Sequence, residues 1–228
     1  MSEPLRIALV GATGLIGRTV IEQCVGRTDI CLFAIARREM PLPVGARMEM
    51  HIADPAQWGN LIGAIRPAAM ISALGTTWAQ AGKDEDAFRA VDERLVLVTA
   101  RAAKVHGVRN FVAVSSAGAN SLSRNFYLKV KGEVEGALRQ IGFDRLDILR
   151  PGLLRGERDG DRRLGERIGI IAAPITDLLM QGKYRAYRSV RAEDVAQAAL
   201  ALAMRKAKGK FVHDPDAIQR AAAGLPVA

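Results

Sequence analysis

The chain has 228 residues, of which 49% are hydrophobic and 25% are charged, and its formal net charge is +9. This length predicts one domain, and the composition excludes a disordered or collagen-like chain. The basic balance favours anionic ligands, among them phosphates, cofactors and nucleic acid, without choosing between them. We expect no nucleic-acid partner, because the basic residues at 155–167 alternate with acidic ones, which is typical of a solvated surface.

The cysteine count and the apolar stretches bear on the compartment. Cys24 and Cys31 cannot form a disulfide framework, and no Cys or His cluster has metal-ligand spacing, so we expect reduced thiols and no metal. The longest apolar stretch, 168–180, contains Pro174 and Asp177 and is too short to span a bilayer. The first residues show no signal-peptide pattern. These features predict a cytoplasmic protein with no membrane partner.

Strand and helix patterns alternate along the first two-thirds of the chain. Short apolar runs predict strands, and segments with helical periodicity follow them. Their spacing predicts an α/β fold of the Rossmann type, in which helices cover both faces of a doubly wound parallel sheet. The expected strands are 5–10, 30–36, 47–52, 68–74, 108–114 and 146–149, and the expected helices are 15–25, 56–66, 85–106 and 127–141.

After residue 151 the alternation becomes less regular. The patterns predict an irregular helix at 162–180, an alanine-rich helix at 193–205, a short strand at 211–213 and a closing helix at 215–223. We see no internal repeat and no linker. We therefore expect residues 1–228 to form a single domain, in which 151–228 contribute a small irregular substrate region and the closing helices.

A glycine-rich loop at residues 11–17 follows the first strand and opens the first helix, with G-x-x-G-x-x-G spacing. In this context Gly11 allows a tight turn, Gly14 lets the backbone approach a pyrophosphate, and Gly17 lets the helix pack against the strand. Exposed N–H groups and the helix dipole then favour phosphates. The alternative is a tight turn that binds nothing. The predicted cofactor-binding residues of the loop are Gly11, Thr13, Gly14, Leu15, Ile16 and Gly17.

Arg37 and Arg38 follow the second expected strand. An NAD site usually has Asp or Glu there, about 20 residues beyond the loop, to bind the ribose 2′-hydroxyl. Two guanidinium groups instead suit a 2′-phosphate, which favours NADP(H) over NAD(H); a solvent-facing arginine pair is the alternative. Asp54, after the third strand, either accepts a hydrogen bond from the adenine amino group or caps the following helix.

Tyr127 and Lys131 are spaced i, i+4 on one expected helix, so they share a face. The preceding strand ends in Ser115 and Ser116, at the crevice where such sheets bind ligands. An ammonium group beside a phenol favours the phenolate and makes the phenol a better acid–base catalyst at neutral pH. A serine hydroxyl can hydrogen-bond the substrate oxygen during hydride transfer. The alternative is an exposed Tyr–Lys pair on the helix with no catalytic role.

Four motifs occur in order across nearly the whole chain: Gly11-x-x-Gly14-x-x-Gly17, Ser115-Ser116, Tyr127-x-x-x-Lys131 and Arg150-Pro151-Gly152. In these motifs the sequence resembles the extended or atypical short-chain dehydrogenases/reductases. Segments 74–77, 127–135 and 143–145 are similar to the Tat-interacting-protein-like oxidoreductases and their small bacterial relatives. Many family members carry an Asn in the helix before the serine strand, whereas residues 83–105 contain none and Asn110 lies after that helix.

The resemblance implies roles for individual residues. Ser115 or Ser116 would orient the substrate, Tyr127 would be the acid/base, and Lys131 would bind the nicotinamide ribose and tune the tyrosine. A homodimer formed through long helices such as 85–106 is also an expectation from the resemblance. The remaining residues that it implies to line the cofactor are Ala73, Leu74, Gly75, Pro151 and Gly152.

Three functions remain open from the sequence. The first, which we predict, is an NADPH-dependent reductase of a small carbonyl substrate that uses Ser–Tyr–Lys catalysis. The second is an NADP(H)-binding regulator or redox sensor with little turnover, and the third is a nucleotide-sugar epimerase or dehydratase. The substrate pocket would be built from loops 118–126, 153–165 and 182–188.

Overall fold

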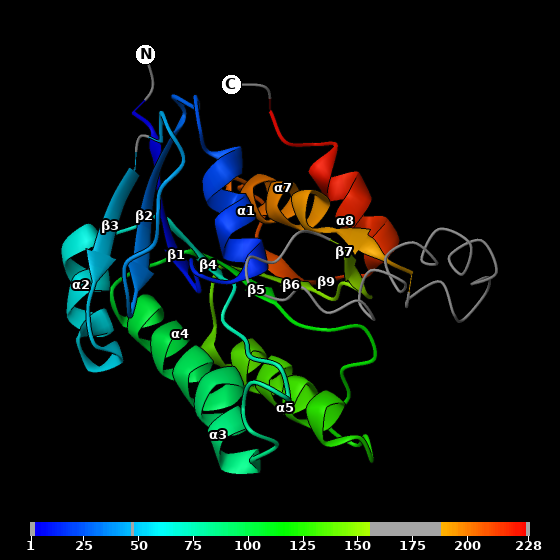
Figure 1. The fold of residues 1–228 in the computed structure, drawn as a ribbon. Coiled ribbons are helices and arrows are strands. Elements are labelled where there is room, and N and C mark those ends of the chain that lie inside the picture. Colours follow the sequence, from blue (N-terminus) through cyan, green and yellow to red (C-terminus); the bar gives the residue numbers. More distant parts are fainter. Residues whose placement is uncertain (1–2, 47, 156–187, 227–228) are drawn as a thin grey trace.

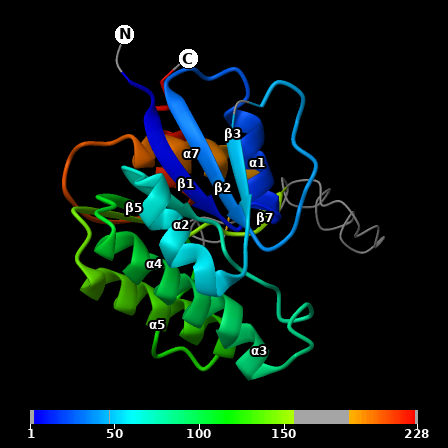
Figure 2. The same cartoon turned by 90° about the vertical axis from the view of Figure 1, so that its left-hand side faces the viewer.

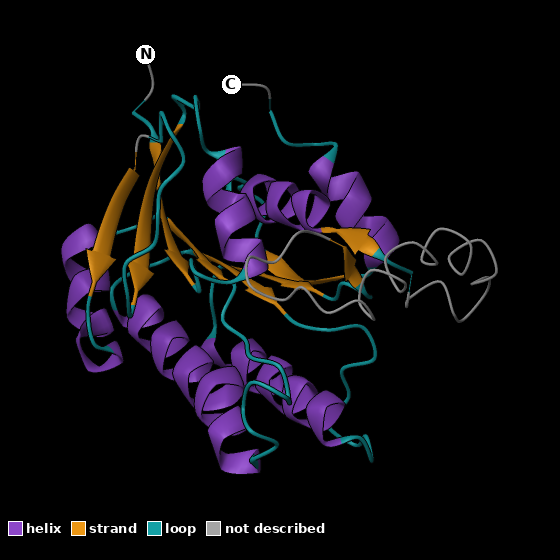
Figure 3. Cartoon of the chain, in the orientation of Figure 1, coloured by secondary structure: helices purple, strands orange, loops and turns teal. Residues whose placement is uncertain are grey.

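The computed structural model describes residues 3–46, 48–155 and 188–226. In these residues a seven-stranded sheet has the order β3-β2-β1-β4-β5-β6-β9, and each neighbouring pair is parallel. Helices cover both faces of the sheet (Figures 1 and 3). The predicted Rossmann-like α/β fold is therefore confirmed.

The elements follow the alternation expected from the sequence. The strands of the main sheet are β1 (Leu5–Val10), β2 (Ile30–Ala36), β3 (Met48–Ile52), β4 (Ala69–Ser72), β5 (Asn110–Val114), β6 (Arg145–Leu149) and β9 (Gly209–His213). The helices are α1 (Leu15–Gln23), α2 (Trp58–Ile65), α3 (Glu85–Arg89), α4 (Val96–Val105), α5 (Phe126–Ile141), α7 (Ala192–Ala203) and α8 (Pro215–Ala222). A 3₁₀ turn, η1 (Pro55–Gln57), precedes α2, and a π-helical turn, η2 (Ala90–Leu95), joins α3 to α4.

Two hydrophobic cores lie on the two faces of the sheet. Ile7 and Leu9 of β1 pack into the core with α1, α7 and α8, whereas Ala8 and Val10 pack into the core with α2, α4 and α5. Figure 2 shows α2, α4 and α5 together on one side of the strands. Because successive side chains point to opposite faces, a strand covered on both faces is mostly apolar. This is why β2 appears in the sequence as an unbroken apolar run, whereas β6 buries Asp147, which pairs with Arg145 and His213.

The order of the strands reverses beside β1. From β1 the chain moves outward to β2 and β3, then returns to β4 on the other side of β1 and continues through β5, β6 and β9. In such sheets ligands bind at the carboxyl ends of the strands, at the point where the order reverses. The loops after β1 and β4 therefore meet at the expected binding edge.

The structure differs from the predicted elements in a few places. The expected helix 85–106 is divided by η2, because apolar periodicity does not distinguish one π turn within a long helix. Asn110 is the first residue of β5, and its amide donates hydrogen bonds to the carbonyls of Ala203 and Arg205 at the end of α7. Asn110 therefore has a structural role, which joins β5 to the end of α7. A two-stranded parallel pair, β7 (Leu154–Arg155) and β8 (Val190–Arg191), is too short to show in the pattern.

The C-terminal elements complete the main layers. Strand β9 extends the sheet beside β6, and α7 and α8 pack on the same face as α1. The predicted helix 162–180, all but Arg155 of the basic segment 155–167, and most of pocket loops 153–165 and 182–188 lie outside the described residues. No helix within the described ranges is both long and apolar enough for a membrane span.

Candidate functional site

Two glycines of the loop after β1 are required by the packing of the chain itself. Gly11 has a φ of +83°, and a Cβ added there would lie 2.4 Å from the carbonyl carbon and oxygen of Ala73. A Cβ on Gly17 would lie 2.1 Å from the carbonyl oxygen of Gly11. The tight turn between β1 and α1, and its contact with the end of β4, therefore exclude any side chain at these two positions.

Gly14 is different, because the protein around it leaves room for a side chain. Its φ of −80° suits any residue, and the nearest atom to an added Cβ is the Gly11 carbonyl oxygen at 3.4 Å. Gly14 is also exposed. The chain's own packing does not explain a glycine here, whereas a ligand whose phosphates approach the backbone would.

The N-terminus of α1 lacks a capping side chain. Gly14 occupies the cap position without a side-chain hydrogen bond, and the first turn holds no acidic residue. By contrast, Asn125 and Asp214 cap α5 and α8 through their side chains. The uncapped N–H groups and the positive end of the helix dipole at α1 provide donors suited to a phosphate.

Arg37 and Arg38 extend from the same edge of the sheet. They come directly after β2, whose Ile35 is in register with Val10 at the end of β1. Both are exposed, and neither makes a hydrogen bond or ion pair with the described part of the chain. Asp54 accepts a hydrogen bond from the Ala56 N–H at 2.8 Å and so caps η1. Asp54 therefore acts as a helix cap, which was one of its two predicted roles, and its contact with the adenine stays a prediction.

The end of β4 joins the glycine loop to a buried ion pair. The Ala73 N–H donates to the Val10 carbonyl at 2.9 Å, which places residues 73–75 beside the loop. A Cβ on the exposed Gly75 would lie 3.8 Å from Lys131 Nζ. The predicted cofactor segment 73–75 and the predicted lysine are therefore neighbours in space.

Tyr127 and Lys131 lie on the first two turns of α5. Lys131 Nζ lies 5.9 Å from the centre of the Tyr127 ring, and Phe88 packs edge-on against that ring with centroids 5.6 Å apart. The Tyr127 side chain is half-buried, and its hydroxyl makes no hydrogen bond to the described residues. Lys131 forms a 2.6 Å ion pair with Asp92. The phenol is thus available for a ligand, and the ammonium is held by a carboxylate.

The two serines after β5 differ in their partners. The Ser115 hydroxyl donates to Glu135 Oε1 at 2.6 Å, and Arg150 donates to both oxygens of the same carboxylate at 2.9 and 2.5 Å. This hydrogen bonding raises the pKa of Arg150 above its ordinary value. The Ser116 hydroxyl donates to the neighbouring Ala117 carbonyl at 3.3 Å, a longer contact. Ser115 is therefore fixed in a protein network, and Ser116 is less constrained.

The loop after β5 is held directly on α5. The Asn120 N–H donates to the Leu128 carbonyl at 3.0 Å, and a Cβ on Gly132 would lie 2.2 Å from the backbone nitrogen of Ser121. The Ala117 N–H donates to the Pro151 carbonyl at 2.9 Å. The structure thus brings the serines, the Tyr–Lys pair and the Pro151–Gly152 turn to one edge.

Sequence reasoning missed three residues of this arrangement: Asp92, Glu135 and Gly132. Glu135 lies on the same face of α5 as Lys131, at i+4, and this spacing was an available signal. A glycine directly after Lys131 was a second signal, since a glycine inside a helix often marks a close backbone approach. Nothing in the local sequence indicates that Asp92 pairs with Lys131.

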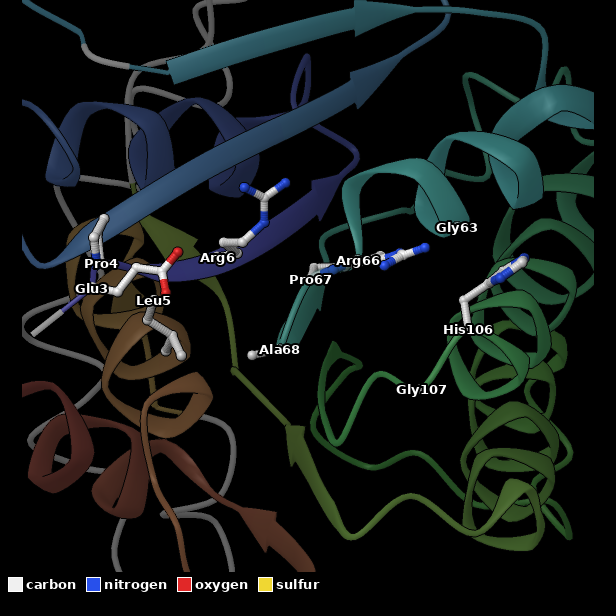
Figure 4. Close-up of a pocket in the computed structure, with 10 residues that line it drawn as sticks. All are labelled: Glu3, Pro4, Leu5, Arg6, Gly63, Arg66, Pro67, Ala68, His106 and Gly107. Atoms are coloured by element: carbon white, nitrogen blue, oxygen red, sulfur yellow. The ribbon is translucent and has the colours of Figure 1, made fainter.

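Two other features lie outside this edge. A cavity of about 590 Å³ opens at the amino ends of β1, β4 and β5, lined by Leu5, Arg6 and Ala68 among others (Figure 4). The Arg6 guanidinium is engaged there, donating to the Ile65 carbonyl and stacking on the Phe33 ring. Among the described residues, no group of three or more His, Cys, Asp and Glu side chains could hold a metal ion.

Comparisons with known proteins identify the family of the chain. A family model described as NAD(P)H-binding matches residues 11–206, and the fold defined above is that of an NAD(P)-binding, oxidoreductase-like protein. "Protein FMP52, mitochondrial" of Eremothecium gossypii is 34% identical over 210 residues, which cover 89% of this chain and 90% of the relative. The Saccharomyces cerevisiae protein of the same name is 37% identical over 160 residues, 69% of each chain. The chain therefore belongs to the NAD(P)H-binding family and is a homologue of the fungal Fmp52 proteins.

Solved structures support the fold. A UDP-glucose 4-epimerase from Thermotoga maritima aligns with a TM-score of 0.66 at 16% identity, covering 91% of this chain and 75% of that one. The enzyme WbmH of Bordetella bronchiseptica, in complex with NAD⁺, gives 0.67 at 17% identity, covering 92% and 75%. At such identities the likeness shows the fold and no particular reaction.

The predicted cytoplasmic location is wrong. The fungal relatives, including that of Aspergillus niger at 33% identity over 163 residues, are named mitochondrial and not cytoplasmic. The prediction failed because free cysteines indicate a reducing environment and do not distinguish the cytosol from other reducing compartments.

Proposed function

We propose that the protein is an NADP(H)-dependent oxidoreductase that reduces a small carbonyl substrate. The observation that carries this proposal is the loop after β1. There the packing of the chain excludes side chains at Gly11 and Gly17, whereas the protein leaves room for a side chain at Gly14. Gly14 is the N-cap position of α1, which no side chain caps. The family match adds that the ligand is an NAD(P) dinucleotide.

The preference for NADP(H) is supported by Arg37 and Arg38. They follow β2 directly, at the position where an NAD site usually has a carboxylate. Both side chains are exposed and make no hydrogen bond or ion pair with the described part of the chain. Two guanidinium groups suit the doubly charged 2′-phosphate through charge-assisted hydrogen bonds. When bound, the cofactor supplies the hydride that the carbonyl carbon accepts.

The protein's own side chains would supply the proton and orient the substrate. The Tyr127 hydroxyl donates its proton to the carbonyl oxygen as negative charge develops there, so that the product is an alcohol. The Ser116 hydroxyl donates a hydrogen bond to the same oxygen. We assign this role to Ser116 because the Ser115 hydroxyl is already committed to Glu135. Lys131 lies near the Tyr127 ring and would contact the cofactor ribose.

Variants at these positions test the proposal. NADPH oxidation is followed across a panel of small aldehydes, ketones and enones, with the cofactor affinity measured by fluorescence titration. Tyr127→Phe should abolish turnover and leave NADPH affinity near that of the wild type. Ser116→Ala should lower turnover more than Ser115→Ala. Unchanged turnover of Tyr127→Phe would show that this tyrosine is not the acid.

A second candidate is an NADP(H)-binding sensor with little turnover. It is favoured by one observation: Ser115 and Lys131, two of the predicted catalytic side chains, are already bound to Glu135 and Asp92 in the protein. NADPH that binds tightly but is not consumed across the panel would support this function.

A further inference from the structure

We propose that Trp78 is a specificity-determining residue, whose indole ring packs against the apolar part of the substrate beside Tyr127. The substrate class that follows is an uncharged aldehyde or ketone with an apolar chain or ring. This inference rests on the proposed function, because it names the substrate of the same site. The packing of an apolar group on Trp78 can also be measured without turnover. Neither the motifs nor the family match assigns Trp78 a role.

Trp78, in the loop after β4, belongs to an aromatic cluster that includes Tyr127. The Trp78 ring is tilted against Phe126 with centroids 5.3 Å apart, and it packs edge-on against Phe88 at 6.2 Å. Phe88, which is buried, also packs edge-on against the Tyr127 ring at 5.6 Å. Trp78 and Tyr127 therefore share one buried ring, and the indole is part of the surroundings of the phenol.

Hydrogen bonds within the loop fix the backbone that carries Trp78. The Thr77 N–H donates to the side-chain oxygen of Gln80 at 3.3 Å, and the Gln80 N–H donates to the Thr77 hydroxyl at 3.1 Å. The Lys83 N–H donates to the Trp78 carbonyl at 3.0 Å. A side chain that is already ordered loses less entropy when a ligand packs on it. The turn therefore presents the indole in a form prepared for binding.

The two tryptophans of the chain differ in how completely the protein uses them. Trp58 is buried, and its indole N–H donates to the Ala53 carbonyl at 3.1 Å. Trp78 is 37% exposed, and its N–H makes no hydrogen bond to the described part of the chain. An indole combines a large apolar face with one polar donor. At Trp78 part of the face and the donor are both left for a ligand.

The next two loops at the carboxyl edge of the sheet also expose a large apolar side chain. Leu122, in the loop after β5, is 89% exposed, and Leu153, in the loop after β6, is 59% exposed. The loops after β4 and β5 both reach α5 (Figure 1), where Leu122 precedes Phe126 by four residues. Exposed apolar side chains that gather at one place mark a binding surface. The edge that carries Tyr127 therefore offers apolar surface from three consecutive loops.

Two cations beside the aromatic cluster are already neutralised by the protein. Lys131 pairs with Asp92 at 2.6 Å. Arg89, at the end of α3, pairs with Glu93 and with Glu133 of α5. An anionic substrate, such as a nucleotide sugar, needs cations that are free to pair with its phosphates. The surface beside the cluster therefore favours a substrate without charge.

A series of substrates of increasing length tests the contact through turnover. The wild type, Trp78→Ala and Trp78→Phe are compared by NADPH oxidation with straight-chain aldehydes from propanal to octanal. Because burial of each CH₂ group is favourable, kcat/KM of the wild type should rise roughly twofold to fourfold per CH₂ group. Trp78→Ala should lose most of this rise, and Trp78→Phe should keep part of it, since a phenyl ring can still pack on Phe126. Succinic semialdehyde, which ends in a carboxylate, should react roughly tenfold or more slowly than butanal.

A matched control separates Trp78 from exposed apolar side chains in general. Val105 is also exposed, but it ends α4 beside the cavity at the amino ends of the strands. Val105→Ala should therefore show the chain-length dependence of the wild type. A wild-type kcat/KM that does not rise with chain length would overturn the inference, and so would an equal rise in Trp78→Ala.

Tryptophan fluorescence tests the contact without cofactor. Octanol, which cannot react in the absence of NADP⁺, is titrated into the wild type and into Trp78→Phe, in which Trp58 is the remaining tryptophan. Octanol should change the emission of the wild type until the site is saturated and should protect it from quenching by acrylamide. It should leave the emission of Trp78→Phe unchanged.

The two experiments separate failure of this inference from failure of the proposed function. A saturable octanol signal in a protein that oxidises no NADPH with any aldehyde would refute the proposed function and support apolar binding at Trp78. An octanol titration without effect on the wild type would overturn the inference. So would free wild type as shielded from acrylamide as Trp78→Phe, because the chain itself would then cover Trp78.

Discussion

Replacing Gly14 by alanine separates what the fold requires from what a dinucleotide requires. The φ of −80° accepts alanine, and the new methyl group would meet one atom of the protein, the Gly11 carbonyl oxygen at 3.4 Å. Alanine is a poorer N-cap than glycine, so the free energy of unfolding should fall by about 0.5–1 kcal/mol. The methyl group would occupy the surface on which the pyrophosphate rests. Losing one hydrogen bond to a charged phosphate costs about 1.5–3 kcal/mol, so the NADPH dissociation constant should rise roughly ten- to a hundredfold.

Gly17→Ala is the matched control, because its Cβ would lie 2.1 Å from the Gly11 carbonyl oxygen and the backbone would have to move. Such overpacking costs about 1–3 kcal/mol, so this variant should lose stability as well as affinity. Urea unfolding and fluorescence titration with NADPH measure the two quantities on each protein. Wild-type affinity in Gly14→Ala would refute the idea that this loop cradles phosphates. An equal loss of stability in both variants would refute the distinction between the two glycines.

Two further predictions concern the packing at Gly132 and the thiol of Cys24. Gly132→Ala should destabilise the protein and lower turnover, because its Cβ would lie 2.2 Å from the Ser121 nitrogen and would push the loop after β5 off α5; thermal unfolding and NADPH oxidation check this. Burial raises the pKa of the Cys24 thiol from 9.0 to about 12, so the folded protein favours the neutral thiol. As the pH rises from 9.0 towards 12, the unfolded thiol ionises first and the free energy of unfolding should fall. Urea titrations on both sides of pH 9.0 should show that the free energy of unfolding falls less with rising pH in Cys24→Ala than in the wild type. An identical fall in the two proteins would contradict the assignment of this pH dependence to the Cys24 thiol.

The fold was predictable because its signals are local. Inner strands such as β1 and β2 are covered on both faces, so each appears as a short apolar run. The glycine loop is equally local, since the turn, the phosphate approach and the helix packing all fall within residues 11–17. Sequence alone also placed Arg37 and Arg38 at the end of β2, because the length of the run fixes where that strand ends.

The parts of the site that sequence could not predict depend on contacts between distant residues. The choice between Ser115 and Ser116 depends on Glu135, which lies 20 residues after Ser115 on the next helix. The partner of Lys131 is Asp92, on another helix, and its burial follows from a π turn that apolar periodicity does not reveal. Asp54 fitted two interpretations in the sequence, because an aspartate before a helix can cap it or accept a hydrogen bond from a ligand, and the structure shows the cap.

The most direct test of the central claim is a parallel titration of the wild type and the Arg37→Ala/Arg38→Ala variant with NADPH and NADH. The proposed site predicts that the wild type binds NADPH more tightly than NADH, and that the variant loses roughly tenfold or more in NADPH affinity while its NADH affinity hardly changes, because one doubly charged phosphate loses its partners. Equal weakening of both cofactors would contradict the preference for NADP(H). Absence of binding to either cofactor by the wild type would contradict the dinucleotide site itself.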